Sequence, residues 1–240
     1  MAVLWLIRHG QASFGTSDYD CLSDIGRIQS ALLGRYFTAA GIRFSSCVTG
    51  TLKRQRETRK IAFSELPGDH VPVVTTDAAL NEYDFNAIIH DHLTAVCEAD
   101  PSLEACLRSA ATDPRAFQKL YHPIITRWMQ GAVGEGGAEP YAVYRQRVLA
   151  GLDRSAAKDS DGRVAIFTSG GVLTVAMEAA LGLSIERARD VGWQVRNASI
   201  SCFTLNPASE DSGGRNLRLK SFNTTAHLDG AGDHTVLTYR

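Results

Sequence analysis

The sequence predicts an α/β fold, with a doubly wound, mostly parallel sheet flanked by helices and carrying a helical insertion. Short apolar runs alternate with longer segments of helical periodicity, which is the pattern of βαβ units. The first run is apolar on both faces, as in a strand buried in a parallel sheet. The 240 residues, 44% of them hydrophobic, suffice for a large core. We therefore expect a single domain over residues 1–240, with a helical insertion or lid at about residues 86–145.

The first half of the chain supplies three expected strands and two helices. Residues 3–7 (VLWLI) predict the first strand. Ser23 is a suitable N-cap for a helix with apolar residues at helical spacing. The remaining elements follow as a strand at 45–50, a helix at 51–66 and a strand at 71–78.

The second half begins with the insertion, whose helical patterns are broken by prolines and by a glycine-rich stretch. The interruptions lie at Pro101, Pro114, Pro123 and residues 131–140. Beyond them the pattern predicts a helix at 142–157, a strand at 162–169, a helix at 170–183, and strands at 198–206 and 216–223 joined by a turn at 210–215. The last two strands are expected to form a hairpin.

Composition excludes several classes of protein. The 25 basic and 26 acidic residues give a net charge of −1, so no overall positive field attracts nucleic acid or an anionic membrane. No apolar stretch approaches the roughly 20 residues of a membrane span. The 5 cysteines are scattered without a CxxC pair, which favours free thiols in a reducing cytoplasm over zinc binding. We expect no metal, no cofactor, no nucleic-acid partner and a cytoplasmic location.

A polar triplet, Arg8-His9-Gly10, ends the first expected strand. Ligands of doubly wound sheets bind at the carboxyl ends of the strands, so the triplet lies where a site forms. Glycine at its end allows a sharp turn and a close approach of a ligand. The alternative is that Arg8 and His9 are merely solvated or cap a carbonyl.

The triplet belongs to an ordered set of motifs: RHGQAS, LSDIGRIQ, TLKRQRET, LNEYDF, and a strand followed by SGGVL and a helix. This set resembles the histidine phosphatase superfamily, or phosphoglycerate mutase-like family. The resemblance implies that His9 is a nucleophile that becomes phosphorylated, that Arg8 and Arg54 bind phosphate, and that Glu82 is the general acid. Ser169 stands where the family has a second histidine, and its hydroxyl is expected to bind the phosphate with one neutral hydrogen bond in place of the charged one.

The chemistry of these residue types supports the same roles. Phosphoryl transfer depends on positioning and on stabilising the charge of the phosphoryl oxygens, which guanidinium groups bind bidentately. A neutral imidazole can attack phosphorus, and a carboxylic acid can protonate the leaving oxygen. The N–H groups of Gly170 and Gly171, which open a helix, could point at a bound anion.

Several assignments keep an alternative. Arg54 lies among other basic residues and could belong to a solvated helix face. Glu82 could cap the insertion, and Asp84 is a rival for the acid role. His90 and His92 are interpreted as surface residues rather than metal ligands.

Two positions depart from the family pattern: Ser169, and Gly15, where many members have asparagine. The site could be a weak but real phosphatase, it could use His227 or His122 in place of the missing histidine, or it could bind phosphate without turnover. The first is favoured: slow, metal-independent hydrolysis of a small phosphomonoester through phosphorylated His9. A phosphate-ligand binding or regulatory protein is the alternative. Four aromatic residues could line an apolar pocket wall or belong to the core: Tyr83, Phe85, Tyr121 and Trp128.

Overall fold

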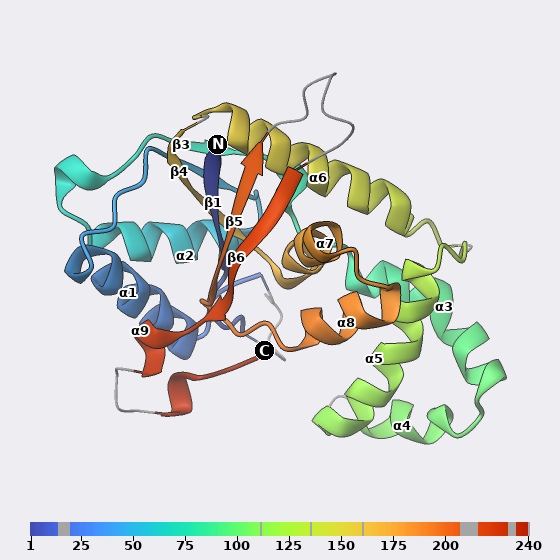
Figure 1. The fold of residues 1–240 in the computed structure, drawn as a ribbon. Coiled ribbons are helices and arrows are strands. Elements are labelled where there is room, and N and C mark those ends of the chain that lie inside the picture. Colours follow the sequence, from blue (N-terminus) through green and yellow to red (C-terminus); the bar gives the residue numbers. More distant parts are fainter. Residues whose placement is uncertain are drawn as a thin grey trace.

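The protein is built on one mixed sheet that runs through its centre (Figure 1). The computed structural model describes residues 1–13, 20–110, 112–134, 136–159, 161–206, 216–229 and 234–239. Its sheet has the strand order β3-β2-β4-β1-β5-β6. The strands are β1 (Ala2–Arg8), β2 (Ser46–Thr49), β3 (Val74–Thr76), β4 (Arg163–Thr168), β5 (Ile200–Asn206) and β6 (Asn216–Thr224).

Strand direction confirms the predicted fold class. The pairs β3–β2, β2–β4 and β4–β1 are parallel, whereas β5 pairs antiparallel with both β1 and β6. The predicted hairpin is thus β5 and β6. Its turn at 210–215 and the departure at Gly15 lie outside the described residues.

Helices cover both faces of the sheet, as the largely apolar central strands β1 and β4 require. Neighbouring side chains of a strand point to opposite faces, so Leu6 packs in the core cluster on one side and Ile7 in the cluster on the other. The helices α1 (Asp24–Ala39) and α2 (Lys53–Ser64) cover the Ile7 face, and α6 (Tyr141–Ala157) and α7 (Gly170–Leu181) cover the Leu6 face (Figure 1).

The insertion is helical and lies beyond α7 (Figure 1). It contains α3 (Phe85–Ala99), α4 (Leu103–Ser109) and α5 (Pro114–Met129). Pro123 was expected to break the pattern, but α5 continues through it. A lid role for this segment stays a prediction.

The sequence missed one helix that matters for the site. The helix α8 (Ile185–Trp193) begins at Ser184, whose hydroxyl accepts from the amide of Arg187. Its 9 residues follow α7 so closely that the periodicity gave no separate signal. It packs against α5 and α7, which places the end of α8 beside the insertion.

Two smaller expectations were wrong. Only Val74–Thr76 of the strand predicted at 71–78 is extended in the sheet, because Pro72 has no N–H for the ladder. His92 is buried, at 1% exposure, because it lies on the inner face of α3 with Ile88 and Val96; His90 is exposed, as predicted. Short helical turns occur at Gly68–His70 (η1), Ala78–Leu80 (η2), Ala226–Asp229 (α9) and His234–Val236 (η3).

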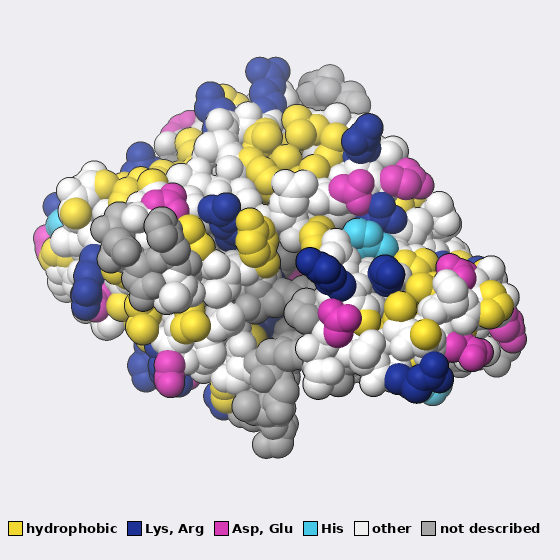
Figure 2. Space-filling model, turned by 90° about the horizontal axis from the view of Figure 1, so that it is seen from below, with side chains coloured by type: hydrophobic (Ala, Val, Ile, Leu, Met, Phe, Trp, Pro, Cys, Tyr) yellow, Lys and Arg dark blue, Asp and Glu magenta, His cyan; other side chains and the backbone are white. Residues whose placement is uncertain are grey.

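The described surface mixes charges of both signs. On the face drawn in Figure 2, Lys and Arg side chains are interspersed with Asp and Glu side chains. This part of the surface therefore lacks the single-sign field that concentrates polyanions. None of the helices within the described residues is both long enough and apolar enough to cross a membrane.

Candidate active site

A cavity of about 650 Å³ opens at the carboxyl end of β1. Five residues predicted for the site line it: Arg8, His9, Arg54, Glu82 and Gly170. They come from the end of β1, the first turn of α2, the loop after η2 and the start of α7. Residues far apart in the sequence therefore meet where doubly wound sheets bind ligands.

Two hydrogen bonds fix the tautomer of His9. The Nε of Arg54 donates to Nε2 of His9 at 3.1 Å, and guanidinium nitrogen is only ever a donor. Nε2 is therefore unprotonated, and the proton lies on Nδ1, which is 2.7 Å from the carbonyl oxygen of Gly10. Nε2 thus presents a lone pair beside the cation that would hold a phosphoryl group.

The surroundings of His9 keep its ring neutral. Burial lowers its pKa well below the usual value of 6.5, and the positive charges of Arg54 and Arg8 lower it further, against a smaller raising effect of the Gly10 carbonyl. A neutral ring is the nucleophilic form.

Each arginine of the site is already oriented by the protein. Arg54 forms an ion pair with Asp20 at 2.8 Å, and it is almost fully buried. Arg8 donates to the carbonyl oxygens of Val195 and Tyr239, the latter at 2.8 Å. Asp20 is thus the group with which an incoming anion would compete for Arg54.

Gly10 is required for packing rather than for ligand approach. A Cβ atom at this position would lie 2.4 Å from the carbonyl oxygen of Gly26 in α1. Its amide also donates to Oγ1 of Thr58 at 3.0 Å, and that hydroxyl donates to the carbonyl of Arg54 at 2.8 Å. Gly10 therefore connects the His9 loop to both α1 and the helix that carries Arg54.

Glu82 lies on the N-terminus of α7. Both of its carboxylate oxygens accept from the amide of Gly171 at 3.1 Å, and Tyr144 donates to Oε1 at 3.3 Å. A Cβ at Gly171 would stand 2.2 Å from Oε1, so only glycine permits this arrangement. The amide expected to face a substrate anion is instead bound to the protein's own carboxylate.

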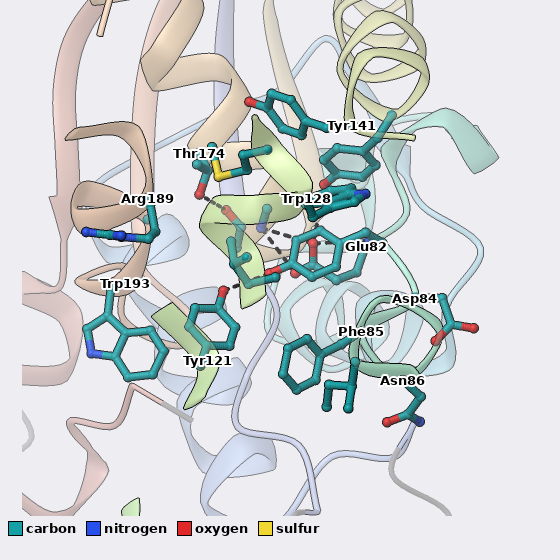
Figure 3. Close-up of a pocket in the computed structure, with 18 of the residues that line it drawn as sticks. Glu82, Asp84, Phe85, Asn86, Tyr121, Trp128, Tyr141, Thr174, Arg189 and Trp193 are labelled. Carbon is teal, nitrogen blue, oxygen red and sulfur yellow. Dashed lines mark hydrogen bonds between the residues drawn. The ribbon is translucent and has the colours of Figure 1, made fainter. Parts of the chain in front are cut away.

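The two carboxylates of the LNEYDF segment, Glu82 and Asp84, occupy different positions. Asp84 caps the insertion, because its Oδ1 accepts from the amide of Ala87 at 3.1 Å. Figure 3 shows Asp84 at the outer edge of the cavity, pointing away from it, whereas Glu82 lies inside.

Ser169 is buried and bound by another side chain. It is the N-cap of α7, and its Oγ accepts from the amide of Gln55 at 2.9 Å. Gln55 also donates to the carbonyl of Leu80 at 3.1 Å. Ser169 is not among the described residues that line the cavity, so the phosphate-binding role predicted for its hydroxyl has no support in this geometry.

We predict that Gln55 and Ser169 behave as a pair. Ser169→His should destabilise the protein by about 1–3 kcal/mol, because the ring would overpack a buried site filled by Gln55. Gln55→Ala should cost a similar ~1–3 kcal/mol, because it removes donors from buried acceptors. In the double variant the two costs should partly cancel, as measured by urea unfolding of all four proteins. Strictly additive costs would show that Gln55 does not occupy the space that the ring needs.

Neither histidine considered as a replacement lines the cavity. His227 stacks on Tyr36 of α1 with ring centroids 5.7 Å apart, and burial lowers its pKa to about 4. His122 packs against Trp193 with ring centroids 5.1 Å apart, behind the wall that Trp193 forms. The idea that either histidine replaces the missing one is not supported by their positions.

Aromatic side chains form most of the cavity wall. The four residues singled out from the sequence all line it: Tyr83, Phe85, Tyr121 and Trp128. The sequence missed five further aromatic residues in the lining: Phe117, Tyr141, Tyr144, Trp193 and Tyr239. The only signal for them was their aromatic character, because the helices α5, α6 and α8 are brought together by tertiary packing.

Within the described residues, no group of three or more His, Cys, Asp or Glu side chains is placed to hold a metal ion. Around His9 the cavity instead offers the guanidinium groups of Arg8 and Arg54, the neutral imidazole and the Glu82 carboxylate. This set can bind a phosphoryl group, attack it and transfer a proton.

The family comparison agrees with this geometry. Residues 4–216 match the family model described as histidine phosphatase superfamily (branch 1). The chain belongs to this superfamily. The match includes every residue placed in the site above except Tyr239.

Solved histidine phosphatase-like structures share the fold. Bacillus stearothermophilus YhfR aligns with a TM-score of 0.65 and 18% identity over 95% of this chain and 100% of its own. A mycobacterial glucosyl-3-phosphoglycerate phosphatase aligns with a TM-score of 0.63 and 19% identity over 93% and 99%. A phosphoglycerate mutase from Bacillus anthracis gives 0.65 and 18% over 97% of each chain.

A sequence relative carries a phosphatase name. The mitochondrial serine/threonine-protein phosphatase Pgam5 of Caenorhabditis briggsae is 32% identical over 119 residues, which are 50% of this chain and 40% of the relative. The matched segment thus spans less than half of that relative. Proteins named as phosphatases are therefore found among both the sequence and the structural relatives of this chain.

Proposed function

We propose that the protein is a phosphatase that hydrolyses a small phosphomonoester through a phosphohistidine on His9. The observation that carries the proposal is the bond from Arg54 to Nε2 of His9, which places a lone pair and a phosphate-binding cation 3.1 Å apart. Arg8 and Arg54 would hold the non-bridging oxygens and neutralise charge in the transition state.

In the first step Arg54 exchanges its hydrogen bond to Nε2 of His9 for bonds to the phosphoryl oxygens. The freed lone pair of Nε2 attacks phosphorus, and the bond between phosphorus and the leaving oxygen breaks. Protonated Glu82 gives its proton to that oxygen, so the alcohol departs neutral. Tyr144 retains its own proton, because burial and then the Glu82 charge raise its pKa well above 10. It therefore remains a donor that orients Glu82.

In the second step the Glu82 carboxylate takes a proton from water as the water oxygen attacks phosphorus. The bond between Nε2 and phosphorus breaks, inorganic phosphate leaves, and His9 returns to its neutral form. Glu82 is again protonated, so the cycle closes without a further reactant. None of these steps uses a cofactor.

Rapid mixing with a phosphomonoester labelled in its phosphoryl group tests the proposal. We expect an acid-labile, base-stable label on His9 that forms before inorganic phosphate is released. Hydrolysis should be unchanged in the presence of a chelator. Turnover without a label on His9, in a reaction quenched within one cycle, would contradict the phosphohistidine route.

Phosphate-ligand binding without turnover is the second candidate. The observation that favours it is that Ser169 lies outside the described cavity lining, which leaves the phosphoryl group without the side-chain donor expected at this position. Calorimetry with inorganic phosphate alongside the labelling experiment separates the two candidates. Tight binding with neither label nor product would establish the binding protein.

A further inference from the structure

We propose that the leaving group of the substrate carries an aromatic ring, which is held by the aromatic wall of the cavity. This inference rests on the proposed phosphatase function, since it concerns the part of the substrate attached to the phosphoryl group. One side of the cavity is lined by five aromatic residues, here called the aromatic wall: Tyr83, Phe85, Phe117, Tyr121 and Trp193.

The aromatic wall is continuous and partly open to the cavity. Phe85 lies 5.3 Å from Tyr121, and Tyr121 lies 4.7 Å from Trp193, as ring-centroid distances. Figure 3 shows these three rings side by side. All five side chains of the wall are only partly buried, so their ring surfaces remain available to a ligand.

The aromatic wall is also held rigidly. The hydroxyl groups of Tyr83 and Tyr121 are hydrogen-bonded at 2.8 Å, and Tyr83 packs on Trp128 with ring centroids 4.9 Å apart. Burial raises the pKa of Tyr83 well above 10, with a further contribution from Tyr121, so this pair stays uncharged. A preformed apolar surface binds a flat apolar group with a smaller ordering cost than a mobile one.

The charges near the aromatic wall do not favour an acidic leaving group. Apart from Arg8 and Arg54 at the end of the cavity proposed to bind phosphate, here called the phosphate corner, Arg189 is the one cation among the described lining residues. Its guanidinium is paired with Asp190 at 2.6 Å and donates to Thr126. Asp84 adds a negative charge at the rim. Because Asp190 already neutralises Arg189, a carboxylate or second phosphate on the leaving group would lack an unpaired cation near the wall.

The wall joins the phosphate corner directly. Tyr83 follows Glu82 in the chain, and its amide donates to Oε1 of Glu82 at 3.3 Å. A ring on the leaving group, about three bonds from the oxygen that Glu82 protonates, would meet Tyr83 first and Tyr121 next. Binding energy from this ring can therefore position the phosphoryl group for attack.

The test uses three phosphomonoesters with similar alkyl leaving oxygens: 2-phenylethyl, 2-cyclohexylethyl and ethyl phosphate. We expect kcat/KM for the phenylethyl ester to exceed that for the ethyl ester by about 30-fold or more, from burial of the ring. It should exceed the cyclohexylethyl ester by about 3- to 10-fold, from stacking on the wall. The acidic ester 3-phosphoglycerate should be no better than ethyl phosphate.

Trp193→Leu should lower kcat/KM for the phenylethyl ester by about 5- to 10-fold and leave that for ethyl phosphate within about 2-fold. Trp5→Leu is the matched control. Trp5 lies on the opposite side of the sheet against Phe37 and Phe44, so the ratio between the two esters should not change. An ethyl ester or 3-phosphoglycerate that is hydrolysed as well as the phenylethyl ester would overturn the aromatic assignment.

A non-hydrolysable analogue separates this proposal from the phosphatase function. In 3-phenylpropylphosphonate a methylene replaces the leaving oxygen, and calorimetry should show binding that weakens about 5-fold in Trp193→Leu. Such binding without turnover of any ester would retain the aromatic recognition and overturn the phosphatase. Turnover of ethyl phosphate with no preference for a ring would retain the phosphatase and overturn the recognition.

Discussion

His9→Ala is expected to lower kcat/KM for any phosphomonoester by about 10⁴-fold or more, because it removes the atom that attacks phosphorus. Residual hydrolysis would come only from water attacking a phosphoryl group held by Arg8 and Arg54. Affinity for inorganic phosphate should change by less than about 10-fold, since both guanidinium groups remain. Steady-state kinetics and calorimetry on the same preparation measure the two quantities.

His90→Ala is the matched control for this change. The His90 side chain is 81% exposed on α3, away from the described cavity lining, so kcat/KM should stay within about 2-fold of the parent. If His9→Ala retained the activity of the parent protein, the nucleophile would have to be another group.

Glu82→Gln should show a loss that depends on the leaving group. With ethyl phosphate, kcat/KM should fall by about 10²–10⁴-fold, because the departing alkoxide needs a proton. With 4-nitrophenyl phosphate the fall should be below about 10-fold, because nitrophenolate leaves without one. The ratio kcat/KM reports phosphorylation of His9, so the later attack by water does not mask the difference.

Asp84→Asn distinguishes the two carboxylates. Asparagine caps helices as well as aspartate does, so α3 should be retained and both esters should be hydrolysed at rates within about 2-fold of the parent. If Asp84→Asn instead produced the leaving-group dependence, the acid would be Asp84 and the position of Glu82 on α7 would be structural.

That Arg8 and His9 line the cavity could be predicted from the sequence, because their position in the sequence determines their position in the fold. Arg8 and His9 end a strand that is recognisable by its apolar run, and all such ends in a parallel sheet meet at one edge. The fold class followed from the same alternation of strands and helices. The family resemblance added Arg54 and Glu82, which the cavity then brings together with His9.

The residues that hold the site residues in place or complete the cavity wall could not be predicted in the same way. Gln55 stands between two basic residues and looks like part of a solvated helix face. Its spacing with Thr58 and Ala62, which share the buried face of α2, was the signal for its burial. Tyr144 lies on α6 and Trp193 on α8. No local sequence pattern predicts that these two helices line the same cavity.

Glu82 and Tyr83 are adjacent in the chain, so the residue proposed to transfer the proton is bonded directly to a residue proposed to contact the leaving group. The Tyr83 amide donates to Oε1 of Glu82, so a substitution at Tyr83 that shifts this amide would also shift the proposed proton donor and change the rate of reaction. Trp193 lies on a separate helix and Phe117 on another, and each can vary without moving Glu82. New substrate preferences should therefore arise first at positions 117 and 193, with position 83 among the last to change.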